Sequence, residues 1–188
     1  SDEVYRHLNF DSDEIFSIAT LPGMKERTLI IDSVSKSFAM TGFRVGFATG
    51  PVHLIELMTK CVENVYSAVA TPSQYAALVA FDKGMEAMMA MKKEYKKRRD
   101  FLVSRINEMD KISCIMPKGA FYVFANIKKT GLSAEEFAER LLEKEHVAVI
   151  PGSNFSKNAS GYVRISYGTS MEKIEDGLNR MECFLKSL

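Results

Sequence analysis

The sequence predicts an α/β protein in two parts, residues 1–84 and residues 85–188. Two short apolar segments, 28–32 and 45–48, have the composition of strands and are followed by two predicted helices. The second part begins with a long helix predicted over residues 85–109, after which short strands and helices follow in an α+β order. These three observations define the predicted fold class.

Proline marks the beginning of both helices predicted in the first part. Pro51 and Pro72 can each occupy a first helical turn, where the missing backbone N–H costs little. Apolar residues then recur along each helix: Leu54, Ile55, Leu57, Met58 and Val62 in the first, and Tyr75, Ala76, Leu78 and Val79 in the second. We expect these helices to cover the sheet of the first part.

Strand and turn signals follow the long helix. Predicted strands at 112–116 and 120–127 are separated by the turn sequence at 117–119, Pro-Lys-Gly. A short strand is predicted at 147–150, where a Pro-Gly pair ends it, and another contains Arg164. The second part is therefore expected to contain its own small sheet.

Two capping signals place the last helices. Ser133 with Glu136 forms a capping box, and Thr169 with Glu172 forms a second one. The helix after the second signal has one apolar face: Ile174, Leu178, Met181 and Leu185. We expect this face to pack on the small sheet.

Composition allows a sizeable core and gives no electrostatic reason to expect nucleic acid as a partner. Of the 188 residues, 46% are hydrophobic, and the formal net charge is +1. The one basic run, residues 92–99, is crossed by apolar positions at helical spacing. We therefore expect it to be a solvated helix face.

Cysteine usage indicates neither a disulfide framework nor a metal site. Cys61, Cys114 and Cys183 are widely spaced and form no CxxC or Cys/His cluster. A reducing cytoplasm fits this pattern best. Because no apolar run approaches the length of a membrane span, we expect a soluble, cytoplasmic chain with no membrane partner.

The segment from Ser33 to Arg44 is the most informative part of the sequence, and it joins the two predicted strands of the first part. The hydroxyl groups of Ser33 and Ser35 can donate to phosphate oxygens, and the planar guanidinium of Arg44 can clamp a phosphate. Lys36 would then lie within reach of an aldehyde. This combination suits an aldehyde cofactor that carries a phosphate group.

Three further residues gain meaning only together with this segment. Arg164 alternates with apolar residues, so in a strand its side chain would lie on the opposite face of the sheet from theirs. Asp2 and Tyr5 lie close together near residue 1. Taken singly, Lys36 would be a surface lysine and Arg164 a solvated edge residue. Asp2 and Tyr5 would be terminal polar residues. Their joint spacing with Lys36 and Arg44 favours a functional interpretation.

The sequence SVSKSFAMTGFRVGF at 33–47 resembles the lysine motif of the class I and II aminotransferases, fold-type I enzymes that depend on pyridoxal 5'-phosphate. DEVY at 2–5 resembles the family's Asp-x-x-Tyr element, and GYVRISY at 161–167 resembles the element with the substrate-carboxylate arginine. The resemblance implies that residues 1–84 belong to a large cofactor-binding domain with a mostly parallel sheet. Residues 85–188 would form the small C-terminal domain.

The resemblance implies a role for each residue that faces the cofactor ring. Lys36 would hold the cofactor's aldehyde covalently and later move a proton between the substrate's α carbon and the cofactor's C4'. Asp2 would pair with the protonated pyridine nitrogen, which keeps the ring a strong electron sink. Tyr5 would donate a hydrogen bond to the phenolic oxygen of the cofactor.

The remaining carried-over roles concern two anionic groups. Ser33, Ser35 and Arg44 would hold the cofactor phosphate and so fix the ring. Arg164 would bind the substrate α-carboxylate in a bidentate pair, which orients the α C–H bond for cleavage. No residue is assigned to a metal.

Members of the family are about twice as long as this chain. We therefore expect a C-terminal fragment that lacks the glycine-containing phosphate loop and the aromatic residue that stacks on the cofactor. Alone, it is expected to bind the cofactor weakly and to transaminate poorly or not at all. The full-length protein is expected to be a homodimer.

The implied reaction is the transfer of an amino group from an L-amino acid to a 2-oxo acid. The MTGFR, PGSNF and GYVRISY segments look most like the aspartate and aromatic aminotransferase branch. We expect aspartate first as the amino donor. A carbon–sulfur lyase or another fold-type I enzyme remains an alternative, because it shares the fold and the lysine. So does a cofactor-sensing effector domain of a transcription regulator, which would have a DNA-binding domain upstream.

Overall fold

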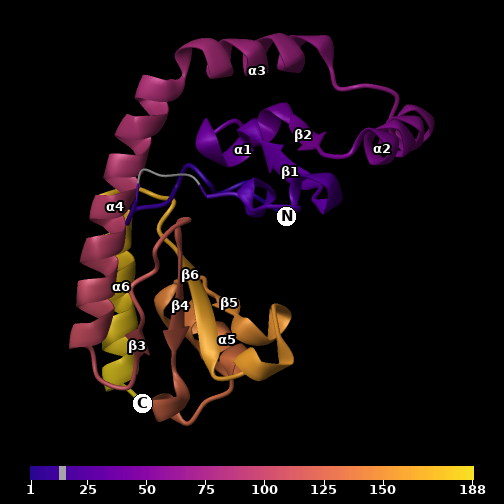
Figure 1. The fold of residues 1–188 in the computed structure, drawn as a ribbon. Helices are drawn as coiled ribbons and strands as arrows, with labels where there is room; N and C mark the ends of the chain where they lie inside the picture. The colour runs from indigo at the N-terminus through magenta and orange to yellow at the C-terminus, as the bar shows by residue number, and fades with distance from the viewer. Residues whose placement is uncertain (13–15) are drawn as a thin grey trace. The chain divides into compact units, whose positions relative to one another are not determined.

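The computed structural model describes residues 1–12 and 16–188 (Figure 1). The chain divides into two compact units, Ser1–Lys92 and Lys93–Leu188. The division falls inside the long helix α4 (Met85–Glu108), whose predicted extent of 85–109 is confirmed. The proposed domain boundary between residues 84 and 85 stays a prediction.

The first unit is built around a strand pair that holds the lysine segment. β1 (Ile30–Ser33) pairs with β2 (Gly46–Thr49) in antiparallel register, with Ile30 opposite Thr49. The connection contains the short helix α1 (Val34–Ser37) and the 3-10 helix η3 (Thr41–Phe43). The strands therefore occur close to the predicted positions.

The strand pairing differs from the mostly parallel sheet that the resemblance implied. Among the described residues of the first unit, parallel pairing occurs only at an isolated bridge between Asp2 and Ile31. The twelve-residue connection between β1 and β2 returns the chain beside β1 in the opposite direction, so the two strands pair antiparallel.

Two helices follow β2 in the first unit. α2 (Val52–Val65) has Pro51 as its N-cap, and α3 (Thr71–Lys83) carries Pro72 in its first turn, as predicted. None of the residues of α2, all of which the structure describes, is buried. Five large apolar side chains are exposed along it: Val52, Leu54, Leu57, Val62 and Val65. The 3-10 helices η1 (Ile18–Thr20) and η2 (Lys25–Arg27) precede β1.

The second unit contains a four-stranded antiparallel sheet with the strand order β3-β4-β6-β5 (Figure 1). Its strands are β3 (Ser113–Cys114), β4 (Tyr122–Asn126), β5 (Ile150–Pro151) and β6 (Tyr162–Ser166). β3, β4 and β5 are shorter than the predicted strands, and β5 begins at Ile150, the residue at which the predicted strand ended. Residues 147–149 form no strand.

Helices α5 (Ala134–Glu145) and α6 (Met171–Lys186) complete the second unit. Arg105 of α4 donates hydrogen bonds to Asn179 and Glu182 of α6, each at 3.1 Å, so these helices run side by side (Figure 1). The core lies between the helices and one face of the sheet. Its fully buried members include Val123, Phe137, Leu141, Val163, Met181 and Phe184. The 3-10 helices η4 (Lys128–Thr130), η5 (Gly152–Asn154) and η6 (Lys157–Ala159) lie in the connections.

The capping predictions are confirmed at one helix and wrong by one residue at the other. The Ser133 hydroxyl accepts from the backbone N–H of Glu136 at 3.2 Å, as a capping box requires. At α6, however, the N-cap is Ser170 and not Thr169, and its hydroxyl accepts from the backbone of Lys173. Both hydroxyl residues suit a cap, so sequence alone does not separate them.

Candidate functional site

The lysine segment begins where β1 ends. Ser33 is the N-cap of α1, and its hydroxyl accepts from the backbone N–H of Ser35 at 3.3 Å. The backbone N–H of Ser33 donates to Asp32 Oδ1 at 2.7 Å. These two contacts fix the turn from strand into helix, and Lys36 stands half-buried within that helix.

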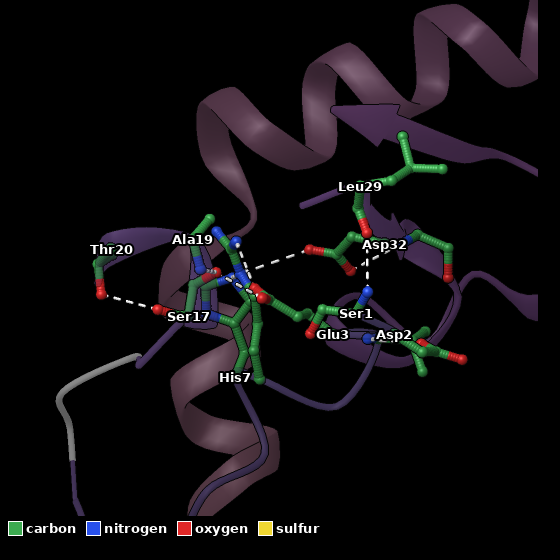
Figure 2. Close-up of polar contacts among 12 residues, drawn as sticks. Ser1, Asp2, Glu3, His7, Ser17, Ala19, Thr20, Leu29 and Asp32 are labelled. Atoms are coloured by element: carbon green, nitrogen blue, oxygen red, sulfur yellow. Dashed lines mark hydrogen bonds and ion pairs between the residues drawn. The ribbon is translucent and has the colours of Figure 1, made fainter. Parts of the chain in front are cut away.

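The first three residues of the chain lie beside β1 and the residue that precedes it. The backbone N–H of Glu3 donates to the Ile31 carbonyl at 2.8 Å, and the Ile31 N–H donates to the Ser1 carbonyl at 2.9 Å. The terminal amine of Ser1 also donates to the Leu29 carbonyl at 2.7 Å (Figure 2). Asp2 is thereby held beside β1.

Tyr5 and Lys36 are close in space. Lys36 Nζ lies 5.8 Å from the centre of the Tyr5 ring, above its face. An ammonium group at this distance is attracted by the negative face of the ring. The structure thus brings together two of the predicted site residues that lie far apart in the sequence.

Arg44 ends the lysine segment in an unusual backbone conformation. Its φ is +55°, in the left-handed region that non-glycine residues seldom adopt, and Ala39 has a φ of +53°. The Arg44 side chain is exposed and donates from Nη1 to the Thr41 carbonyl at 2.9 Å. Such strain persists where the surrounding structure fixes the backbone, and it is frequent at functional sites.

Asp2 and Ser33 line one cavity of about 660 Å³ in the first unit, together with residues of β2 and α2. Lys36, Tyr5 and Arg44 are not among its lining residues. The cavity therefore joins two of the predicted cofactor-binding residues, while the Lys36–Tyr5 contact joins two others.

Arg164 belongs to the second unit, so the structure tests its local surroundings and not its predicted grouping with Lys36. It lies at the centre of β6, half-buried, while its neighbour Val163 is fully buried. The predicted separation of Arg164 from the apolar positions is therefore confirmed for Val163. Its guanidinium carbon lies 4.3 Å from the centre of the Tyr122 ring and 4.4 Å from that of Phe155.

Sequence reasoning missed a buried charged cluster next to the site. Arg6 Nε lies 3.4 Å from Asp32 Oδ2, and Arg6 Nη1 lies 3.8 Å from Glu3 Oε2. Both carboxylates are buried, and the hydroxyl of Ser17 donates to Glu3 Oε1 at 2.5 Å (Figure 2). Each charged residue is adjacent in sequence to a predicted site residue, but residues 4–7 form a turn, so no alternation along the chain indicated the cluster.

Burial and charge shift two pKa values in this cluster. Burial raises the pKa of the Asp32 carboxyl, while the backbone N–H of Ser33 and the guanidinium of Arg6 oppose the rise. Burial also lowers the pKa of His7, and the adjacent Arg6 charge lowers it further. Arg6 Nε donates to His7 Nε2 at 3.4 Å, which requires this nitrogen to be unprotonated.

A model of the family described as aminotransferase class I and II matches residues 1–181. The chain belongs to the class I and II aminotransferase family. This result confirms the family resemblance predicted from the sequence. Members of the family generally use pyridoxal 5'-phosphate.

Curated relatives of this aminotransferase-family chain include two archaeal enzymes. The aspartate aminotransferase of Pyrococcus abyssi is 46% identical over 188 residues, which are 99% of this chain and 48% of that protein. Aromatic-amino-acid aminotransferase 2 of Thermococcus litoralis is 44% identical over 188 residues, again 99% of this chain and 48% of that protein. The chain spans about half the length of the curated relatives it matches.

Solved aminotransferase structures share the fold. The aromatic aminotransferase of Pyrococcus horikoshii OT3 has a TM-score of 0.95 at 46% identity, over 100% of this chain and 50% of that chain. The aspartate aminotransferase of Rhizobium meliloti has a TM-score of 0.92 at 33% identity, over 98% of this chain and 48% of that chain. The α/β fold class is therefore confirmed.

The side chains of Arg44 and Asp2 suit the family's cofactor. Arg44 is exposed and holds only a backbone carbonyl, so its guanidinium can turn to a phosphate. The Asp2 carboxylate is exposed beside β1 and accepts from the Val4 N–H at 3.2 Å. In residues 1–12 and 16–188, no group of three or more acidic, histidine or cysteine side chains is placed to hold a metal ion.

No helix among the described residues is both long enough and apolar enough to cross a membrane. All three cysteines are free thiols, of which Cys61 and Cys183 are exposed.

Proposed function

We propose that the protein that carries this chain is a pyridoxal 5'-phosphate-dependent aminotransferase. It transfers the amino group of an L-amino acid to a 2-oxo acid, and aspartate or an aromatic amino acid is the donor. The names of its archaeal relatives, an aspartate and an aromatic-amino-acid aminotransferase, support this substrate class. Because the chain spans about half the length of these relatives, the activity is proposed for the whole protein.

One observation supports the assignment most strongly. The Asp2–Ile31 bridge and the 5.8 Å approach of Lys36 Nζ to the Tyr5 ring bring the Asp-x-x-Tyr element against the lysine segment. These elements lie about thirty residues apart in sequence, and each would be unremarkable alone. Their meeting at β1 and the adjoining helix α1 is what an assembled cofactor site needs.

The residues that would hold the cofactor all belong to the first unit. Ser33, Ser35 and Arg44 would bind its phosphate through hydroxyl and guanidinium donors. The Asp2 carboxylate would pair with its pyridine nitrogen, and Tyr5 would donate to its phenolic oxygen. When bound, the cofactor supplies an electron sink for the negative charge that forms on the substrate.

Two residues of the chain would act on the substrate. Arg164 would bind the α-carboxylate and so orient the α C–H bond. The Lys36 amine would move a proton between the α carbon of the substrate and the cofactor's C4'. Lys36 is half-buried beside the Tyr5 ring, which limits the positions that its amine can occupy.

The isolated chain is proposed to bind the cofactor weakly and to be inactive. The exposed apolar side chains of α2 support this proposal, because surfaces of this kind are normally covered by other protein. In the whole protein we propose a homodimer that works in the cytoplasm. The three free thiols are compatible with a reducing compartment.

Amino transfer from aspartate and from phenylalanine to 2-oxoglutarate tests the proposal. The whole protein should catalyse at least one of these transfers, and Lys36→Ala should lose at least about a thousandfold in rate, because a positioned acid–base group commonly contributes that much. Lys25→Ala, at an exposed lysine of η2, is the matched control and should keep full activity. Equal activity of Lys36→Ala and the control would refute the assignment.

A further inference from the structure

Arg164 differs from every other arginine of its unit in what surrounds its charge. Within residues 93–188, the other five arginines all contact a carboxylate: Arg98, Arg99, Arg105, Arg140 and Arg180. Arg164 has no ion pair or side-chain hydrogen bond within this unit, although it is half-buried. Half-buried charged groups are normally paired, so this guanidinium has unused N–H donors.

Two aromatic rings take the place of the missing carboxylate. The rings of Tyr122 and Phe155 are centred 4.3 and 4.4 Å from the guanidinium carbon, well within the range of a cation–π contact. Rings attract a guanidinium without neutralising it and without using its N–H donors. The contacts therefore hold the charge in place but leave it able to bind an anion.

The two rings reach Arg164 from different segments of the chain. β6 lies between β4 and β5, and Arg164 stands opposite Phe124 of β4 and Ile150 of β5. Tyr122 comes from β4, while Phe155 follows β5 in sequence through the short η5 turn. A guanidinium that is contacted by rings from two separate segments has few side-chain conformations left to it.

Phe155 is itself held in place by a third ring. Its ring centre lies 6.0 Å from that of Phe124, in an edge-to-face arrangement. Phe155 nevertheless remains 49% exposed, so its ring contributes only part of its area to the core. A change at this position thus tests the orientation of Arg164 more directly than it tests folding.

We propose that Tyr122 and Phe155 are positioning residues that hold the Arg164 guanidinium ready for the substrate α-carboxylate. The proposal rests on the proposed function, in which Arg164 binds that group. An arginine side chain loses considerable conformational freedom when it is fixed, and the rings impose that loss before the substrate arrives. The substrate carboxylate then needs only to pair with donors that are already in position.

Steady-state kinetics of the whole protein test this proposal. Phe155→Leu and Tyr122→Leu should each raise the KM for the amino donor roughly three- to thirtyfold, the range expected for a cation–π contact, and change kcat less than about twofold. The ring-preserving controls, Phe155→Tyr and Tyr122→Phe, should keep the KM near the wild-type value. A rise in KM that is equal in the leucine and the ring-preserving variants would overturn the proposal.

Combining the leucine variants with Arg164→Lys separates the orienting role of the two rings from their role in packing. In Arg164→Lys, whose ammonium lacks the planar fork, the leucine variants should add less than about twofold to the KM, because the group that they orient is gone. An unchanged effect in this background would overturn the proposal. If Arg164→Lys alone leaves the KM unchanged, the carboxylate role in the proposed function fails instead. If Tyr122→Leu does not fold, the Phe155 variants decide.

Discussion

Arg6 Nε lies 3.4 Å from Asp32 Oδ2, and this contact joins the Asp-x-x-Tyr element to the strand that leads into Lys36. Arg6 is adjacent to Tyr5, and Asp32 is adjacent to Ser33. The ion pair therefore ties the turn at residues 4–7 to β1, next to the predicted site residues.

Removing the cation of this cluster should destabilise the first unit. Arg6→Met leaves the buried carboxylates of Asp32 and Glu3 without their shared partner, which should cost about 1 to 3 kcal/mol of unfolding free energy, because Arg6 itself is partly exposed. Urea unfolding followed by circular dichroism measures the change. Arg27→Met, at an exposed arginine, is the control and should stay within about 0.5 kcal/mol of wild type. Equal stability of the two variants would contradict the role given to the cluster.

The free energy of unfolding should depend on pH through the titration of the Asp32 carboxyl. Because its pKa in the folded protein is raised above the ordinary 3.8, the folded state binds more protons than the unfolded state in the window above that value. Its contribution to stability is therefore greatest at low pH and falls as the pH rises through the raised pKa. Asp32→Asn cannot bind this proton. As the pH rises across this window, the wild type should therefore lose stability relative to the variant. A difference that stays constant between about pH 3.5 and 7 would show that the carboxyl is not perturbed.

Arg99 should contribute more to the unfolding free energy of the second unit than the exposed residues near it in sequence. It is only 5% exposed, and it donates to the Pro117 carbonyl at 2.9 Å and to Asp100 Oδ1 at 2.8 Å. Arg99→Met should lower the unfolding free energy by about 1 to 3 kcal/mol, whereas Lys97→Met, at an exposed position, should change it by less than about 0.5 kcal/mol. Chemical denaturation of both variants checks this, and a reversed order would be inconsistent with a buried Arg99.

Thiol reactivity should separate the three cysteines. Burial raises the pKa of the Cys114 thiol to about 11, so only a small fraction is the reactive thiolate at neutral pH. Cys61 and Cys183 are exposed. Reaction with a disulfide reagent near pH 8, followed by peptide mapping, should label Cys114 at least about tenfold more slowly than the other two. Complete and equally fast labelling of all three native thiols would contradict the described burial.

Local signals in the sequence were sufficient to place the beginnings of α3 and α5. Pro72 in the first turn of α3 and the Ser133 cap of α5 are short-range features, and the structure confirms both. The burial of Arg99 could not be predicted from such features. The basic run at 92–99 predicts a solvated face, which is wrong for Arg99, because its partner Pro117 lies eighteen positions along the chain and only tertiary folding brings them together.

The candidate site shows the same division between local and long-range information. The residue types of the lysine segment indicated a site for an aldehyde cofactor that carries a phosphate group, and the family match supports this interpretation. The contact between Tyr5 and Lys36, however, depends on the pairing of Asp2 with Ile31, which no local pattern indicates. The pairing of Arg6 with two buried carboxylates was missed for the same reason.

An absorbance titration of the whole protein with pyridoxal 5'-phosphate is the most direct test of the central claim that Lys36 holds the cofactor. Wild type and Lys25→Ala should develop the same visible band at matched cofactor concentration, and Lys36→Ala should not develop it. Addition of aspartate or phenylalanine should then convert the band in the first two proteins only. A band of equal intensity in Lys36→Ala would show that another amine binds the cofactor, and the assignment of Lys36 would be wrong.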